Sequence, residues 1–368
     1  MRQGNSVGRA GVRKTMTLLA GTPLSVLDLA TVVEGMSNAD ALRRTIETAV
    51  HADNLGYRRF WVAEHHGMPA VASSAPSVLI AAIAAATRNI RVGSGGVMLP
   101  NHSSLVVAEQ FGTLVALHGD RIDLGLGRAP GTNGHTAALL RRNLARETEE
   151  DFPRQVLELL AFFGTIPPLE NGVGSAIVAS PGYGDAPLIW LLGSSGFSAR
   201  LAGALGLPFA FAHHFGGGTD PAPVFELYRQ SFRPSSVLSD PWAMVSVAAL
   251  VADDAETAAR LSLSNNLWYI KLRQGAAPGR VPTQAEAEAH SWTDAERIFA
   301  ADRNAQQAIG TVDEVIRRIG DLVAATGVNE VLVVPQGVDQ AGRLRTVSEL
   351  AAESTSLVAG ERQVSRSR

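Results

Sequence analysis

Cysteine is absent from the 368 residues of this chain. Its absence excludes disulfide bonds, a thiolate nucleophile and cysteine-ligated zinc or iron–sulfur sites. Lysine is also scarce, occurring only at Lys14 and Lys271, and the formal net charge is -3. Acidic and basic residues are scattered, with no basic stripe to follow a phosphate backbone. We therefore expect no nucleic-acid partner, and an intracellular location fits the cysteine-free composition.

Long hydrophobic runs are missing as well. The most apolar stretches, residues 78–86 and 188–192, are shorter than the roughly 20 residues that cross a bilayer. Residues 1–15 contain no apolar region followed by a small-residue cleavage site, so they do not predict a secretory signal. We expect a soluble cytoplasmic protein that does not bind membranes, with a disordered lead-in over residues 1–17.

Several motifs of common enzyme classes are not found. No G-x-G-x-x-G follows the first predicted strand, and neither a Walker A loop nor a G-x-S-x-G elbow occurs; residues 193–196 (GSSG) have the wrong spacing for that elbow. These absences argue against a dinucleotide-binding Rossmann domain, a P-loop enzyme and a serine hydrolase.

Short apolar runs alternate along the chain with longer segments of helical period, which is typical of βα units around a parallel sheet. Runs such as 188–192 (LIWLL) are apolar at consecutive positions and indicate strands buried on both faces. Eight such units favour an α/β fold of the (β/α)8 TIM-barrel type over residues 18–355. The predicted strands are Leu24–Leu29, Arg59–Glu64, Ile90–Met98, Arg121–Gly127, Leu188–Gly193, Pro208–Ala212, Ala243–Val251 and Glu330–Pro335. The predicted helices are Ala39–Leu55, Ala75–Thr87, Leu105–Leu117, Phe152–Phe163, Ser198–Leu205, Pro223–Phe232, Ala255–Trp268 and Val312–Thr326.

Two segments are too long for ordinary connections. Residues 128–151 and 271–306 are expected to be insertions that form lids, binding loops or disordered segments near the barrel mouth. Residues 356–368 are expected to form a flexible tail.

One predicted strand ends in a carboxylate and two imidazoles. Residues 60–66 (FWVAEHH) place Glu64, His65 and His66 at the rim of an apolar core, where polar groups must be paired, hydrated or used. Neighbouring strand side chains point to opposite faces, so His65 and His66 cannot easily share one ion, and no H-E-x-x-H helix occurs. We expect no metal and at least one catalytic or ligand-contacting histidine, with purely structural histidines as the alternative.

Glycine and polar residues also follow other predicted strands. Gly95 and Gly96 stand where a barrel strand usually has bulky residues. Either a flat ring that lies over the backbone or a simple β-bulge would explain these glycines. Arg128 is a candidate phosphate ligand or the partner of a surface ion pair. Ser194 and Ser195 would bind a phosphate at a helix N-terminus or simply cap that helix. The remaining candidates for the substrate mouth or lid are His66, His102, His213 and His214.

In their order along the chain, these residues resemble the luciferase-like flavin-dependent monooxygenases and the related deazaflavin-dependent reductases and dehydrogenases. The resemblance extends from Leu24 to about Leu350. The segments that carry it are 61–66, 92–100, 108–110, 119–128 and 309–312.

This resemblance implies a monooxygenase that receives reduced FMN from a separate flavin reductase and uses O2 to oxygenate a small organic substrate, as in natural-product tailoring. It implies a catalytic His65 near the reactive edge of the flavin, Glu64 in the cofactor site, and a cis peptide bond between Gly95 and Gly96 beneath the ring system. It further implies phosphate binding by Arg128 and by the 194–195 turn, a mobile lid over 271–306, and a homodimer.

Two other functions remain open at this stage. One is hydride transfer with the deazaflavin F420 on the same barrel, and the other is a non-catalytic flavin-binding protein. A metal hydrolase is a further, more distant alternative. Gly127 stands where bacterial luciferase has a reactive cysteine, so we do not expect light emission.

Overall fold

The structure of this chain is a computed structural model that describes residues 21–132, 134–140, 151–216, 218, 220–275 and 279–364, with side chains as far as residue 353. The predicted lead-in over residues 1–17 and much of the insertion over 128–151 lie outside these ranges. Across the described ranges, no helix combines the length and apolar composition needed to span a bilayer.

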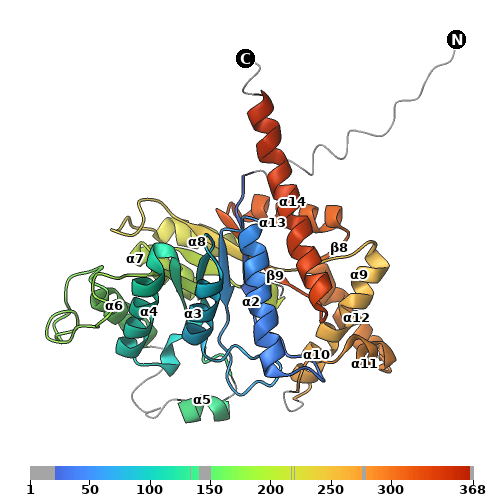
Figure 1. Cartoon of the computed structure of the whole chain (residues 1–368), viewed down its shortest axis with the longest axis horizontal. Helices are drawn as coiled ribbons and strands as arrows, with labels where there is room; N and C mark the ends of the chain where they lie inside the picture. The colour runs from blue at the N-terminus through green and yellow to red at the C-terminus, as the bar shows by residue number, and fades with distance from the viewer. Residues whose placement is uncertain are drawn as a thin grey trace.

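Eight parallel strands form a closed barrel with helices around it (Figure 1). The pairing order is β6-β5-β4-β3-β2-β1-β9-β7, and β6 pairs with β7 to close the ring. This arrangement confirms the predicted (β/α)8 architecture. The strands are β1 (Leu24–Asp28), β2 (Arg59–Val62), β3 (Arg91–Met98), β4 (Ile122–Gly127), β5 (Leu188–Gly193), β6 (Phe209–Phe211), β7 (Ala243–Val251) and β9 (Glu330–Pro335).

Helices cover the outside of this barrel. Figure 1 shows α2, α3 and α4 side by side on one flank, with α14 crossing beside α2. The helices are α2 (Asn38–Asn54), α3 (Pro76–Ala86), α4 (Ser104–His118), α5 (Gly134–Leu140), α6 (Phe152–Phe162), α7 (Gly196–Leu205), α8 (Ala222–Ser231), α9 (Ala255–Leu261), α10 (Leu263–Arg273), α11 (Gln284–Ala289), α12 (Asp294–Ala305), α13 (Val312–Thr326) and α14 (Gln340–Val364).

Local signals set several helix ends as the sequence predicts. Thr311 caps α13 in a reciprocal capping box with Glu314, and Gly327 ends that helix at a φ of 61°. The N-cap of α2 is Ser37, whose hydroxyl accepts the backbone N–H of Asp40 in the first turn.

Two features in the second half of the barrel correct or extend the predicted elements. The predicted helix Ala255–Trp268 is divided at Ser262 into α9 and α10, because the Ser262 hydroxyl bonds to the carbonyl of Ala259 and to the side-chain amides of Asn266 and Asn304. A ninth strand, β8 (Ala308–Gly310), pairs with the end of β7 outside the closed ring and was missed as a strand.

The segment 271–306, expected as a long loop, is largely helical. It contains the end of α10 and the whole of α11 and α12, and the last two begin with capping boxes at Thr283 and Thr293. The capping residues were present in the sequence but were not recognised. At the C-terminus, α14 continues to Val364, past residue 356 where the tail was expected to begin.

Polar and charged residues fill the lower interior of the barrel. Arg59 on β2 is buried and binds Asp123 on β4 through Nη1 (2.6 Å) and Glu330 on β9 through Nε (2.5 Å). The same guanidinium lies over the ring of Trp190 on β5, 4.7 Å from its centroid. Removing one partner from a buried pair of this kind typically costs about 3–5 kcal/mol. This layer therefore holds four strands together beneath the barrel mouth.

An apolar layer lies above those charges. Leu27, Trp61, Trp190, Met244 and Leu332 form a buried cluster inside the barrel. A much larger apolar core packs between the strands and the surrounding helices. The closed floor leaves the C-terminal ends of the strands as the accessible part of the barrel interior, which is where barrel active sites lie.

Candidate functional site

A cavity opens at the C-terminal ends of the strands, directly above this apolar layer. Residues from β1, β3, β4, β5, β6, β7 and β9 and from the turns that follow strands line it. Most of its wall is apolar. Among the predicted site residues, those that line it are His65, Gly95, Gly96, Arg128, Ser194, Ser195 and His214.

His65 follows β2 and presents its ring to the cavity. Its Nδ1 atom lies 3.0 Å from the carbonyl oxygen of Gly131. A carbonyl can only accept, so Nδ1 carries the proton and Nε2 is left with a lone pair. Burial lowers the pKa of His65 below its ordinary value, which keeps the ring neutral near pH 7. His65 is thus a fixed hydrogen-bond acceptor in the cavity wall.

Gly95 and Gly96 on β3 form another part of the wall, and the peptide bond between them is cis, as the resemblance implied. The pairing register between β3 and β4 also shifts between Gly95 and Val97, as expected for a β-bulge. A Cβ at Gly95 would come within 2.8 Å of Leu27, and one at Gly96 within 2.7 Å of the Gly125 carbonyl oxygen. Barrel packing therefore requires glycine at Gly96, where the contact is with rigid backbone, whereas a side chain at Gly95 would have to displace the end of Leu27. The bare backbone at both positions lines the cavity.

Arg128, Ser194 and Ser195 lie together at one end of the cavity. Arg128 follows β4, and the two serines follow β5. Ser195 is the N-cap of α7, has an extended backbone, and makes no capping hydrogen bond with its side chain. The first N–H groups of α7 and the guanidinium of Arg128 therefore offer several donors and positive charge to an anion.

His214 lies across the cavity in the turn after β6. Its Nδ1 is 2.6 Å from the hydroxyl oxygen of Ser246, and that hydroxyl donates to the carbonyl of Phe211. The serine proton is thus engaged elsewhere, so Nδ1 of His214 donates and Nε2 stays unprotonated. Burial lowers the pKa of His214 to about 3, with smaller effects from Arg303 and His65. Ser246 was missed, although it is the only polar residue within β7.

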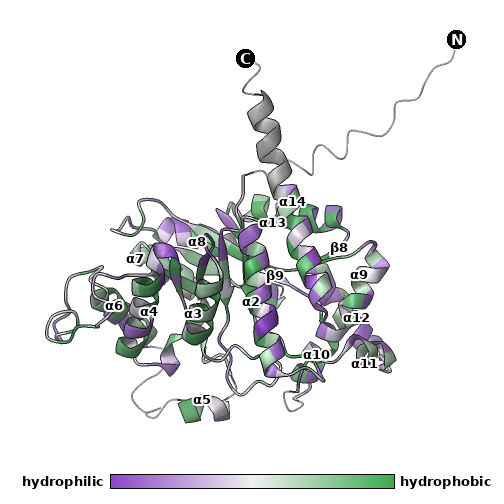
Figure 2. Ribbon diagram, viewed as in Figure 1, coloured by the Kyte–Doolittle hydropathy of each residue, from purple (hydrophilic) through white to green (hydrophobic). Residues whose placement is uncertain are grey.

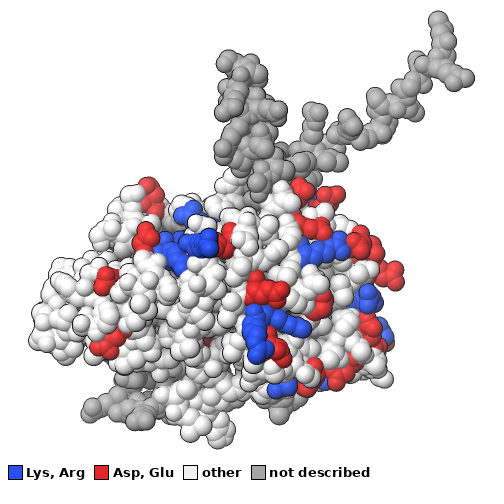
Figure 3. Space-filling view, in the orientation of Figure 1, with Lys and Arg blue, Asp and Glu red and all other residues white. Residues whose placement is uncertain are grey.

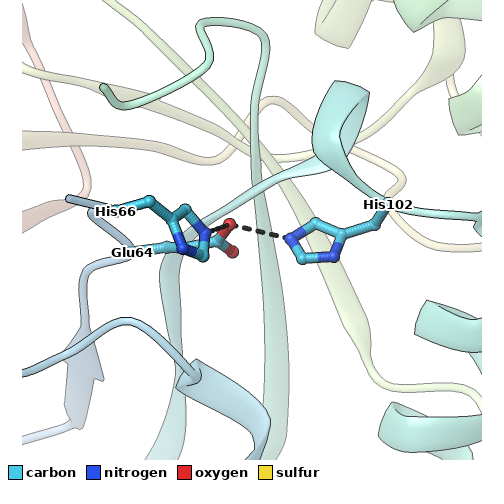
Figure 4. A group of neighbouring side chains, drawn as sticks. All are labelled: Glu64, His66 and His102. Atoms are coloured by element: carbon cyan, nitrogen blue, oxygen red, sulfur yellow. Dashed lines mark hydrogen bonds and ion pairs between the residues drawn. The ribbon is translucent and has the colours of Figure 1, made fainter. Parts of the chain in front are cut away.

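Glu64 does not line this cavity. Its side chain is fully buried, and Oε1 accepts hydrogen bonds of 2.7 Å from Nε2 of both His66 and His102 (Figure 4). Its Oε2 accepts the backbone N–H of Met98, the residue that ends β3. Burial alone would raise the pKa of Glu64, but the hydrogen bonds from His102 and His66 hold it at about 2. We call these three residues the Glu64 cluster.

The Glu64 cluster also has the spacing of a cation site. One ligand atom from each of Glu64, His66 and His102 lies within 4.8 Å of the others. In the sequence, His65 and His66 were the histidine pair considered for a shared ion. In the fold, His66 instead lies beside His102. The hydrogen bonds already satisfy the carboxylate, so the group needs no ion to be stable. That the protein binds no metal remains a prediction, which elemental analysis of the purified protein would check.

The loop after β4 is fastened to the residues that follow β2. Thr132 donates its hydroxyl proton to the carbonyl of His66, and Gly131, its neighbour, supplies the carbonyl that fixes the His65 ring. A Cβ at Gly131 would meet the carbonyl of Glu64 at 2.9 Å, which shows how closely these loops pack. The loop that carries Arg128 is thereby joined to the ends of β2 and β3.

His213 is half-buried beside His214 but is not among the residues that line the cavity. A larger cavity, of about 390 Å³ against 180 Å³, lies between α10 and α11. Its lining includes Trp268, Lys271 and Arg280 and contains none of the predicted site residues. We therefore assign the candidate site to the smaller cavity, where the predicted residues come together.

Comparison with known proteins finds relatives that match most of the chain. The sequence profile described as luciferase-like monooxygenase matches residues 22–330. A protein of Escherichia coli K12 named luciferase-like monooxygenase is 41% identical over 332 residues, which cover 89% of this chain and 96% of the relative. The crystal structure of apo-MsnO8 is 37% identical and has a TM-score of 0.81, covering 91% of this chain and 98% of that one. The oxygenating constituent of 3,6-diketocamphane monooxygenase from Pseudomonas putida, solved with FMN, shares the fold (TM-score 0.67, 22% identity, 91% and 98% covered).

The Glu64 cluster predicts a specific pH dependence of stability. The pKa of Glu64 is about 2 in the folded chain against 4.5 ordinarily, so its stabilisation is fully present above pH 4.5 and is lost as the pH falls towards 2. The shift corresponds to about 3 kcal/mol. We expect the difference in unfolding free energy between wild type and Glu64→Gln to shrink by most of this amount between about pH 6 and pH 3 in urea titrations. The matched control is Asp321→Asn, at an exposed ion pair worth less than about 1 kcal/mol. A wild-type advantage that does not change with pH would contradict the assignment.

Proposed function

Because this chain belongs to the luciferase-like monooxygenase family, we propose that it receives reduced FMN from a separate flavin reductase and uses O2 to oxygenate a small organic substrate. The observation that carries this proposal is the arrangement of one cavity, with bare backbone at Gly95–Gly96, a fixed acceptor at His65, and an anion-binding end at Arg128. Bound reduced flavin would supply the electrons that activate O2.

The residues present fit a phosphorylated flavin. The guanidinium of Arg128, the hydroxyls of Ser194 and Ser195 and the N-terminus of α7 would hold the phosphate. The exposed backbone of Gly95 and Gly96 would support the flat ring system. Glu64, predicted as a cofactor ligand, is better interpreted as a positioning residue, because its carboxylate points away from the cavity into the Glu64 cluster.

His65 would manage a proton at the reacting edge. Its ring lines the cavity, and the Gly131 carbonyl holds it in the tautomer that leaves Nε2 unprotonated. A neutral imidazole that is fixed in orientation can accept a hydrogen bond or take up a proton without first losing one.

The substrate would lie in a second lobe that shares Leu27, Leu29 and His214 with the first cavity. This lobe extends towards α10, whose Trp268 and Tyr269 form part of its wall. Its other walls combine apolar residues with the polar side chains of Asn265, Gln336 and Arg343, which suits a small organic molecule that carries polar groups. The helical segment over 271–306 would act as the lid that excludes water, and the reaction would take place in the cytoplasm, for example as a tailoring step on a natural product.

Cofactor binding tests this proposal directly. We expect reduced FMN to bind in the micromolar range or tighter, and FAD and F420 at least about tenfold more weakly, in anaerobic absorbance titrations. Oxygen consumption with reduced FMN should then depend on an organic substrate in a screen. Tight binding of F420 without oxygen consumption would instead indicate hydride transfer. Bound FMN with no oxygen consumption in any screen would indicate a non-catalytic flavin protein.

His65→Ala tests the catalytic assignment. We expect substrate turnover to fall by roughly 10²–10⁴-fold, because a positioned proton-transfer group is lost, while the Kd for FMN changes less than about threefold. The pH profile of the wild type should show a transition below 6.5, the ordinary pKa of histidine, and the variant should lack it. His118→Ala, on the surface of α4, serves as the control. Wild-type turnover in His65→Ala would refute this role.

We further propose a homodimer that forms through α3 and α4. α3 has no charged residue, and large apolar side chains are exposed on both helices: Val78 is 70% and Leu117 69% exposed. Figure 3 shows little charge over this flank, and Figure 2 shows α3 coloured mostly as hydrophobic. Large apolar side chains exposed on a weakly charged flank are typical of a protein interface.

The dimer can be tested by sedimentation equilibrium. We expect twice the chain mass for the wild type and a single chain mass for the double variant Val78→Asp/Leu117→Asp, because two buried charges would oppose association. Ile298→Asp on α12, at a side chain that is 62% exposed, should remain dimeric. A monomeric wild type would exclude the interface.

A further inference from the structure

The guanidinium of Arg128 rests on an aromatic ring. Its Cζ lies 4.5 Å from the centroid of Phe197, the second residue of α7. Within the part of the chain that the structure describes, no carboxylate lies within ion-pair distance of Arg128, unlike Arg59 or Arg343. The alternative considered from the sequence, a surface ion pair, is therefore not formed with any described residue.

An aromatic partner leaves the N–H donors of Arg128 available, whereas a carboxylate partner would occupy them. Stacking uses the face of the guanidinium plane, whereas the N–H donors point outwards within that plane. A carboxylate would occupy those donors and would have to be displaced before an anion could bind. Phe197 thus holds the cation in place and leaves its hydrogen-bonding edge available.

Phe197 also connects the two halves of the anion-binding end. Its ring contacts Arg128, which follows β4, while its backbone N–H belongs to the first turn of α7, where Ser195 provides no side-chain cap. The ring is 40% exposed and is not part of the cavity lining, so neither core packing nor contact with a ligand accounts for a large apolar side chain here. Its position against Arg128 does account for it.

We propose that Phe197 is a specificity residue that holds Arg128 at the N-terminus of α7 and so makes the cavity select a phosphorylated flavin over the same flavin without phosphate. This inference rests on the proposed function, because it assumes that the cavity binds a flavin. Phe197 itself does not touch the flavin and acts through Arg128.

The comparison of FMN with riboflavin isolates this effect, because the two differ only in the phosphate. For Phe197→Leu we expect the Kd for FMN to rise by about threefold to thirtyfold, the range of a partly shielded cation–π contact. The Kd for riboflavin should stay within about twofold of the wild type, which also shows that the variant is folded. Anaerobic titrations with reduced FMN and with reduced riboflavin, each followed by quenching of the protein's tryptophan fluorescence, give both constants.

Chain-internal controls sharpen the result. Phe299→Leu removes a comparable stack, with Arg273 at 5.0 Å, outside the cavity, and should change neither constant. Arg128→Gln should lose FMN affinity, and adding Phe197→Leu to it should cost nothing more, because the ring acts only through the guanidinium.

The possible results distinguish failure of the proposed role of Phe197 from failure of the proposed function. Loss of FMN affinity in Arg128→Gln but not in Phe197→Leu, or equal losses for both ligands in Phe197→Leu, would overturn the role of Phe197 alone. An unchanged preference for FMN in Arg128→Gln, or a wild type that binds neither flavin, would instead overturn the proposed phosphate site and with it the proposed function.

Discussion

Closure of the parallel barrel governs the rest of this structure. The pairing of β6 with β7 completes the ring, so the C-terminal ends of all eight strands meet at one rim. Below that rim the interior is filled, first by the Arg59 ion pairs and then by the apolar cluster that includes Trp61. The charges are buried where several strands can share them, and the accessible space is confined to the opposite end.

The rim has few charged groups facing its cavity, and neighbours fix both histidine rings and the guanidinium of Arg128 there. His65 and His214 are held as neutral acceptors because a backbone carbonyl and a hydroxyl each bind the other ring nitrogen. Arg128 stacks on Phe197, and among the described residues no carboxylate lies within ion-pair distance of its guanidinium. Because these side chains are already held in place, binding a flat ligand with one anionic end would cost little free energy of reorganisation. The Glu64 cluster stands behind this wall and keeps its backbone in place.

Sequence periodicity predicted the barrel well because its strands are apolar at consecutive positions and its helices have clear end signals. All eight ring strands appear, each within two residues of the predicted bounds, and α13 matches its predicted range. The failures arose where short elements compete with long connections. β8 has only three residues and α11 only six. α12 has twelve, but it carries few apolar side chains, so its capping box at Thr293 is a weak signal without tertiary packing.

The residues that surround the cavity were largely identifiable from the sequence, since polar and glycine residues at strand ends are costly unless they serve a site. The direction of each side chain was not. Glu64 and His65 are adjacent in sequence, yet one faces the Glu64 cluster and the other the cavity. Ser246 matters because it fixes His214, which lies 32 positions away in the sequence. Phe197 matters because it contacts Arg128, which lies 69 positions away.

The sequence by itself determined the strand–helix rhythm, the positions that must be glycine, and the family to which the chain belongs, because these depend on local periodicity and on ordered motifs. Only the tertiary structure decided which histidines share a carboxylate, which tautomers they adopt, and which aromatic ring supports the cation. Those properties depend on distances between strands that are remote in the chain, and barrel closure is what sets such distances.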